Sequence, residues 1–286
     1  MRRSTAGWGS GFLGVAIFSG SLPATRIAVA DFSPMFLTSA RAVIAAAIGA
    51  VFLVALRQGR PSRHDFMTLA IVALGVVAGF PFLTGLALQR VTAAHSIVFI
   101  GLLPLATAAF GVLRGGERPA PAFWLFSVLG AGTVAAFALL RGGEGSLAGD
   151  LLMIAAVLLC GLGYAEGAKL SRRLGGWQVI SWALLLSLPA MAAVALFARP
   201  ENWSAVGAPA WASLAYVSVF SMLIGFVFWY RGLALGGVTG VSQLQLLQPF
   251  FGLTLAAILL GEPISWTMVA STLIVVACVA GARRFT

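Results

Sequence analysis

Three polar side chains recur at a regular spacing inside an otherwise apolar run near the C-terminal end of the chain. The stretch SQLQLLQPFFG places Ser242, Gln245 and Gln248 three residues apart. In a helix, this spacing puts all three side chains on one face. Because polar groups are costly against an apolar surrounding, we expect this face to line a cavity or to contact another helix. Neutral hydroxyl and amide groups can hydrogen-bond a small zwitterion without trapping it.

Aromatic residues elsewhere in the chain are expected to complete this site. An aromatic pocket with a few polar groups is typical of small-molecule binding sites, and the residues we assign to it are Phe82, Phe99, Tyr164 and Trp229, with Ser19 as a further hydroxyl. The alternative for the aromatic residues is ordinary core packing or, for Trp229, an interfacial belt. His95 is assigned to the site as a proton-sensitive group; its alternative is a residue at the membrane interface.

Composition identifies the elements that must hold these residues. The chain of 286 residues is 60% hydrophobic and 9% charged, with a mean hydropathy of +1.00, whereas soluble domains have about 25% charged residues. We therefore predict an all-α membrane protein, since apolar runs in lipid must satisfy their backbone internally. Its ten apolar segments are residues 8–30, 33–57, 65–88, 92–113, 119–140, 148–170, 177–198, 207–231, 238–261 and 264–282.

Basic residues predict the orientation of these segments. The formal net charge is +10, but the Lys and Arg residues are scattered through short loops, which argues against nucleic-acid binding. With a cytoplasmic N-terminus, thirteen of the sixteen Lys and Arg residues at the segment ends, in the connections or at the termini lie inside. Both termini are then cytoplasmic. The remaining two cations, Arg26 and Arg41, lie within apolar segments.

A repeated octapeptide predicts that the chain consists of two related halves. GLALQRVT begins at Gly85 and GLALGGVT begins at Gly232, an offset of 147 residues. Five segments per half is an odd number, so the halves, residues 1–143 and 144–286, would be inverted repeats with a site between them. Pro104 and Pro249 occupy equivalent places in the two halves.

Several residues within the segments are candidate moving parts. A proline inside a helix removes a backbone hydrogen bond, and it produces either a hinge or a static bend. Small residues allow close helix packing, which serves either fixed packing or sliding. The hinge or gate candidates are Pro81, Pro104, Pro249, Gly79 and Gly163. Glu166 lies three residues before Lys169, and we expect the two to neutralise each other on one helix face.

The C-terminal run FVFWYRGLALGGVTGVSQLQLLQPFFGLTLAAILLGEPISW resembles the drug/metabolite transporter superfamily in its ten-helix EamA-type branch. Ser33-Pro34 followed by Arg41 is similar to the same family, although segment 1 has Phe18-Ser19-Gly20 where the family usually has a Trp-Gly pair. The chain is most similar to the bacterial amino-acid exporters of the YddG type.

This resemblance implies a function and its setting. It implies alternating-access export of amino acids, including aromatic and other apolar ones, and of related small metabolites across the bacterial inner membrane. The expected partners are the substrate and the lipid bilayer, with the protein a monomer or weak homodimer. No enzyme activity, nucleotide, cofactor or metal is expected, because no GxxxxGK[ST], HExxH or GxSxG motif is present. The alternatives are a multidrug exporter of hydrophobic cations and a passive pore.

The predicted orientation can be tested with single cysteines. In a variant lacking Cys160 and Cys278, Glu144→Cys should react with a membrane-impermeant thiol reagent in intact cells, whereas Arg60→Cys should react only after lysis. The reason is that the positive-inside rule places the Arg60 loop in the cytoplasm. The opposite labelling pattern would show that the orientation is inverted.

Overall fold

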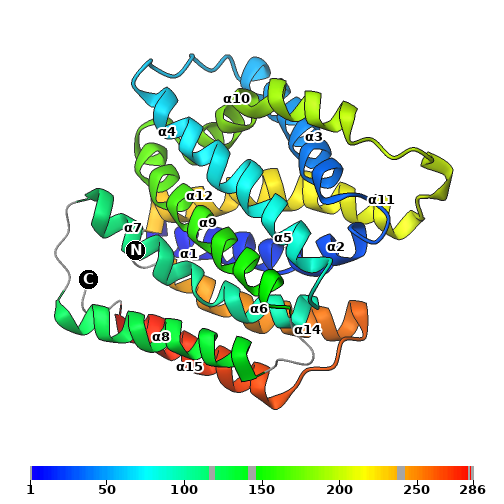
Figure 1. The fold of residues 1–286 in the computed structure, drawn as a ribbon. Helices are drawn as coiled ribbons and strands as arrows, with labels where there is room; N and C mark the ends of the chain where they lie inside the picture. The colour runs from blue at the N-terminus through cyan, green and yellow to red at the C-terminus, as the bar shows by residue number, and fades with distance from the viewer. Residues whose placement is uncertain (1, 116–119, 141–145, 237–241, 283, 285–286) are drawn as a thin grey trace.

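The chain folds into helices that follow the ten predicted apolar segments (Figure 1). The computed structural model describes residues 2–115, 120–140, 146–236, 242–282 and 284, and these contain no strand. The elements are α1 (Arg2–Ser19), α2 (Ser21–Ala28), α3 (Pro34–Ala55), α4 (Asp65–Val72), η1 (Ala73–Gly79), α5 (Phe80–Leu88), α6 (Ala93–Ile100), α7 (Leu103–Gly115), α8 (Pro121–Leu140), α9 (Leu147–Leu174), α10 (Gly176–Phe197), η2 (Trp203–Ala205), α11 (Ala208–Ala215), η3 (Tyr216–Ile224), α12 (Gly225–Gly236), η4 (Ser242–Leu247), α14 (Gln248–Leu260) and α15 (Trp266–Ala282).

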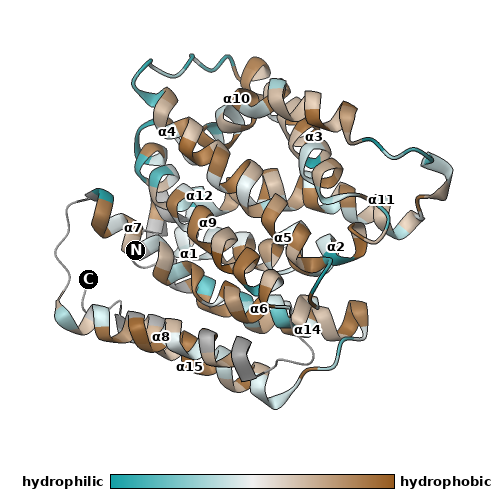
Figure 2. Cartoon of the chain, in the orientation of Figure 1, coloured by the Kyte–Doolittle hydropathy of each residue, from teal (hydrophilic) through white to brown (hydrophobic). Residues whose placement is uncertain are grey.

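Length and hydropathy make this a multi-pass membrane protein. Seven of the described helical stretches are long and apolar enough to cross a membrane, and three shorter apolar helices lie at Trp124–Val134, Leu244–Leu260 and Trp266–Cys278. Figure 2 shows apolar residues along the helices and polar residues in the connections between α3 and α4 and between α10 and α11. The count of ten membrane spans remains a prediction.

Local sequence signals define where several helices begin. The Ser33 hydroxyl accepts a hydrogen bond from the Phe36 backbone N–H at 3.2 Å and so caps α3, whose first residue is Pro34. Thr92 caps α6 in the same way, through the His95 backbone N–H at 3.1 Å. Glu262, from the connection before α15, accepts hydrogen bonds from two further backbone N–H groups at the start of α6. A carboxylate at a helix N-terminus also interacts favourably with the helix dipole.

The helices pack in pairs that join distant parts of the chain. Helix α1 packs along α12, and α9 packs along α4, η1 and α5. Helix α3 packs on α10, and α8 lies beside α15 at one edge of the molecule (Figure 1). Glycines permit the closest approach: a Cβ atom added at Gly75 would lie 2.5 Å from the Leu159 carbonyl oxygen and 3.0 Å from the Gly163 Cα. The centre of the bundle is therefore built from tightly crossed helices.

Candidate functional site

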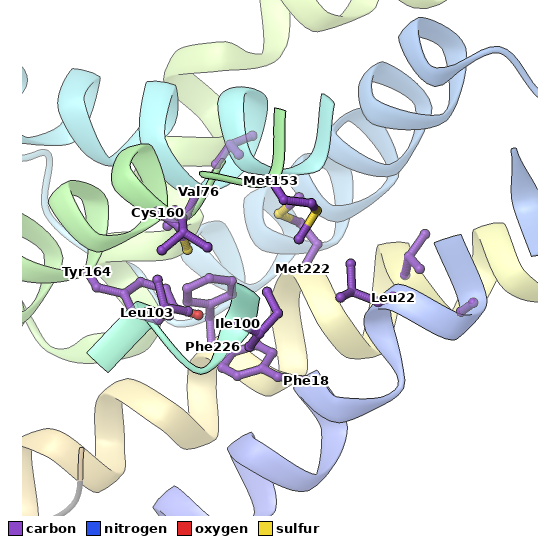
Figure 3. Close-up of a cluster of buried hydrophobic side chains, with 14 of the residues drawn as sticks. Phe18, Leu22, Val76, Ile100, Leu103, Met153, Cys160, Tyr164, Met222 and Phe226 are labelled. Carbon is purple, nitrogen blue, oxygen red and sulfur yellow. The ribbon is translucent and has the colours of Figure 1, made fainter. Parts of the chain in front are cut away.

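A small cavity lies where the interrupted helices of both halves of the chain meet. Its apolar lining comes from Phe18, Leu22, Val76, Phe80, Pro81, Ile100, Leu103, Met222 and Phe226. Its polar lining comes from Ser21, Arg41, Cys160, Tyr164, Ser221 and Gln248. Figure 3 shows side chains from α1, α2, η1, α6, α7, α9, η3 and α12 converging on this region.

Several helices of the described chain contain an irregular stretch, and residues at or next to these stretches line the cavity. The break between α6 and α7 falls at Gly101 and Leu102, and η1 and η3 are π-helical stretches inside longer helices. Ile100, Leu103, Val76 and Met222 line the cavity from these places. Irregular helix turns of this kind are frequent at functional sites, because they leave backbone and side chains free to rearrange.

The break between α1 and α2 depends on a distant tyrosine. The Tyr216 hydroxyl donates a hydrogen bond to the Ile17 carbonyl at 2.6 Å. Gly20 follows this turn, and a Cβ atom there would collide with the Tyr216 hydroxyl. Gly20 therefore lets the ring from η3 enter the turn, and the chain then directs Ser21 and Leu22 into the cavity.

The hinge candidates lie just after irregular helical turns and at the contact between η1 and α9. Pro81, Pro104 and Pro249 are each the second residue of a helix, α5, α7 and α14, that follows an interrupted turn. A proline has no backbone N–H, so it cannot donate a hydrogen bond to the preceding turn. Gly163 lies against η1, where an added Cβ atom would approach Val76 to 3.0 Å; at Gly79 it would lie 2.7 Å from the Leu159 side chain of α9.

Polar groups at the cavity form a short chain. The Arg41 Nη2 donates to the Ser221 Oγ at 3.2 Å, and the Ser221 and Ser21 hydroxyl oxygens lie 2.6 Å apart. Arg41 is 5% exposed, and its Nε has no hydrogen-bond partner in the protein. The Gln248 Oε1 is also buried without a partner. The residues that line the cavity thus include a cationic donor, Arg41 Nε, and a neutral acceptor, Gln248 Oε1, that both lack a hydrogen-bond partner in the protein.

The structure brings some of the predicted site residues to this cavity. Tyr164 and Gln248 line it, as does the hinge candidate Pro81. Trp229 lies behind the lining, with its ring centre 6.3 Å from that of Tyr164 and its Nε1 unpartnered. Gln245, in η4, is 2% exposed, and both of its amide atoms lack a partner.

Other predicted site residues lie away from the lining. The Ser19 hydroxyl donates to the Val15 carbonyl at 2.8 Å, within α1. Phe82 is half-buried on α5, and Phe99 packs against His95 and Phe137. The first residue of the polar face, Ser242, opens the 3₁₀ turn η4, but its side chain lies outside the described residues.

Two buried ionisable residues, Glu166 and His95, have partners that local spacing did not predict. The Glu166 Oε1 accepts a hydrogen bond from the Arg114 Nε at 2.7 Å, so the expectation that Lys169 would neutralise Glu166 is wrong. Lys169 is exposed. The His95 Nε2 lies 2.6 Å from the Asp150 Oδ1, and both residues are buried. These pairs tie α7 to α9 and α6 to α9.

Sequence reasoning missed Arg41, Ser21 and Ser221 as lining residues. The signal for Arg41 was present, since a cation inside an apolar segment is costly and often functional. Ser21 and Ser221 carried no such signal, because isolated serines in membrane helices usually bond to their own backbone.

Comparison with known proteins identifies the family. The model of the EamA-like transporter family matches residues 6–139 and again residues 147–283. The chain belongs to the EamA-like transporter family, within the drug/metabolite transporter superfamily. Its relatives are transporters, which are generally not enzymes.

Curated relatives cover nearly the full length of this transporter. It is 64% identical over 285 residues to the uncharacterized transporter YdeK of Bacillus subtilis, covering 100% of this chain and 99% of the relative. It is 27% identical over 277 residues to an uncharacterized transporter of Synechocystis, covering 89% and 83%. A solved crystal structure that is 21% identical shares the fold, with a TM-score of 0.66 and coverage of 97% and 96%.

The Arg114–Glu166 pair leads to a stability prediction. Arg114→Gln should lower the free energy of unfolding of the purified protein in detergent by about 1–3 kcal/mol, because it leaves the buried Glu166 carboxylate without its partner. The matched control is Lys169→Gln, which should have little effect. The pairing would be contradicted if Lys169→Gln destabilised the protein and Arg114→Gln did not.

Proposed function

We propose that this transporter exports amino acids, including aromatic and other apolar ones, and related small metabolites across the bacterial plasma (inner) membrane. The observation that carries the proposal is the mixed cavity: Phe18, Tyr164 and Phe226 offer aromatic surface, while Arg41 and Gln248 offer polar groups. A molecule with an apolar body and a compact polar end fits such a lining. Export of amino acids is also the activity that the resemblance to YddG-type exporters implies.

Alternating access at this cavity is the mechanism we propose. In the described structure the cavity has a volume of only about 30 Å³, which is room for about two water molecules. An amino acid needs a larger space, so the surrounding helices must separate before it enters. Movement at the turns before Pro81, Pro104 and Pro249, with sliding at the Gly79 and Gly163 contacts, would open the cavity to one side at a time.

Inverted repeats would explain how the same parts serve both sides. The pairing of α1 with α12 has its counterpart in α9 with α4, η1 and α5, while α3–α10 and α8–α15 pair equivalent helices of the two halves. The π-helical stretches η1 and η3 precede the two copies of the repeated octapeptide. These correspondences support two five-helix repeats, residues 1–143 and 144–286, of opposite orientation in the membrane.

The proposed setting has ten membrane spans with both termini in the cytoplasm. Helix α1 begins and α15 ends toward the same side of the molecule in Figure 1, which favours an even number of crossings. We further propose that the protein works as a monomer or weak homodimer and takes no energy from a nucleotide.

A multidrug exporter of hydrophobic cations is the less favoured function. It would use a carboxylate facing the cavity to hold its substrate. Glu166 is a carboxylate within an apolar segment, but it is paired with Arg114 and is not among the lining residues. The cavity instead contains a cation, Arg41, which would repel a cationic drug.

Counterflow in liposomes tests the proposed function. The purified transporter should exchange radiolabelled amino acids such as phenylalanine and leucine with saturable kinetics, and should not exchange nucleosides or cationic dyes. Gln248→Leu should weaken the apparent affinity several-fold, because it removes one neutral hydrogen bond of about 0.5–1.5 kcal/mol. The matched control is Gln178→Leu, since the Gln178 amide bonds Gln58 away from the cavity.

Two results would count against this function. Exchange of dyes but not amino acids would favour the multidrug alternative, and non-saturable, voltage-driven flux would indicate a pore. Unchanged affinity in both Gln245→Leu and Gln248→Leu would move the binding site away from η4 and α14.

A further inference from the structure

Arg41 is a buried cation that faces a cavity inside the membrane-spanning bundle. It lies two turns into α3, is 5% exposed, and lines the cavity described above. Among the described residues, it donates a hydrogen bond to a neutral hydroxyl, that of Ser221. A guanidinium in an apolar surrounding normally pairs with an anion, since the cost of removing the charge from water must be offset.

The described Asp and Glu residues are either bound to groups other than Arg41 or exposed at the surface. The chain has eight Asp and Glu residues, of which Glu117 and Glu144 lie outside the described residues and Glu201 lies in the exposed connection after α10. The other five are bound as follows: Asp31 to the Gly207 N–H, Asp65 to Arg173, Asp150 to His95, Glu166 to Arg114, and Glu262 to the N–H groups of Ala93 and Ala94. Among the described residues, therefore, no carboxylate neutralises Arg41.

The free donors of Arg41 suit a carboxylate. The side of a guanidinium that carries Nε and one N–H of Nη2 presents two parallel donors, which match the two oxygens of a carboxylate. Nε is the atom without a partner, and the Nη2 contact with Ser221 leaves it a second N–H. Ser21 and Ser221 share one hydrogen bond, so one of their two hydroxyl hydrogens remains available to an additional acceptor.

The rest of the lining restricts what the carboxylate can be attached to. Phe18, Phe80 and Phe226 favour an apolar body. The unpartnered Gln248 Oε1 can accept a hydrogen bond from an amino group. We propose that Arg41 binds the carboxylate of the transported molecule, so that the substrates are monocarboxylates with a compact apolar body, among which α-amino acids also satisfy Gln248. This inference rests on the proposed function and assigns it a binding residue.

Matched acids and amides test this assignment through binding. Isothermal titration calorimetry in lipid nanodiscs would compare L-phenylalanine, L-phenylalaninamide and 3-phenylpropanoate, with L-leucine and 4-methylpentanoate as a second series. The wild type should bind L-phenylalanine and 3-phenylpropanoate about tenfold or more tightly than phenylalaninamide, because only the acids accept a charge-assisted pair of hydrogen bonds. Arg41→Gln should abolish this preference.

Two further variants separate binding from folding. Arg41→Lys keeps the charge but removes the two parallel donors, so it should weaken acid binding while leaving amide binding unchanged. It serves as the test variant if Arg41→Gln does not fold. Arg26→Gln is the matched control: Arg26 lies in the neighbouring helix α2, but its guanidinium donates to the Leu88 carbonyl. The acid preference should survive in this control.

The possible outcomes distinguish this inference from the proposed function. Retention of the acid preference in a folded Arg41→Gln protein, or failure of every acid in both series to bind the wild type, would overturn the role of Arg41. Arg41-dependent binding of 3-phenylpropanoate and 4-methylpentanoate without binding of either amino acid would keep the role of Arg41. That result would refute amino-acid export instead.

Discussion

The structure depends on one constraint: within lipid, a charge or a backbone hydrogen-bonding group must find its partner inside the protein. The apolar runs meet this constraint by forming helices, and Glu262 meets it at the start of α6. Buried carboxylates meet it through Arg114 and His95. Arg41 is the exception on the cavity wall, and the binding site we propose follows from that exception.

The same constraint applies where the helices are interrupted. Tyr216 supplies a hydroxyl to the turn before Gly20, while Pro81, Pro104 and Pro249 each follow an irregular turn. Because these irregular turns surround the cavity, the parts able to move are the same parts that would contact a substrate. Glycines at the contact between α9 and η1 let these helices pack closely without large interdigitating side chains that would hinder sliding.

Periodicity and hydropathy predicted the helices well, because a twenty-residue apolar run has few alternatives in lipid. Tyr164 and Gln248, which the sequence analysis assigned to a binding site, both line the cavity. Contacts between distant residues were not predictable in this way. Glu166 pairs with Arg114, 52 positions away, whereas local spacing suggested Lys169. The break at Gly20 involves a tyrosine 199 positions from the carbonyl that it binds, and one sequence alone carries no record of that contact.

The central claim is that one cavity opens in turn to the two sides of the membrane. Ser21→Cys, in a variant lacking Cys160 and Cys278, places a single thiol at the cavity wall. Its reaction with an impermeant thiol reagent should be measured from each side of oriented membrane vesicles, with and without phenylalanine. We predict labelling from both sides and protection by phenylalanine. Labelling from only one side under every condition would contradict alternating access at this cavity.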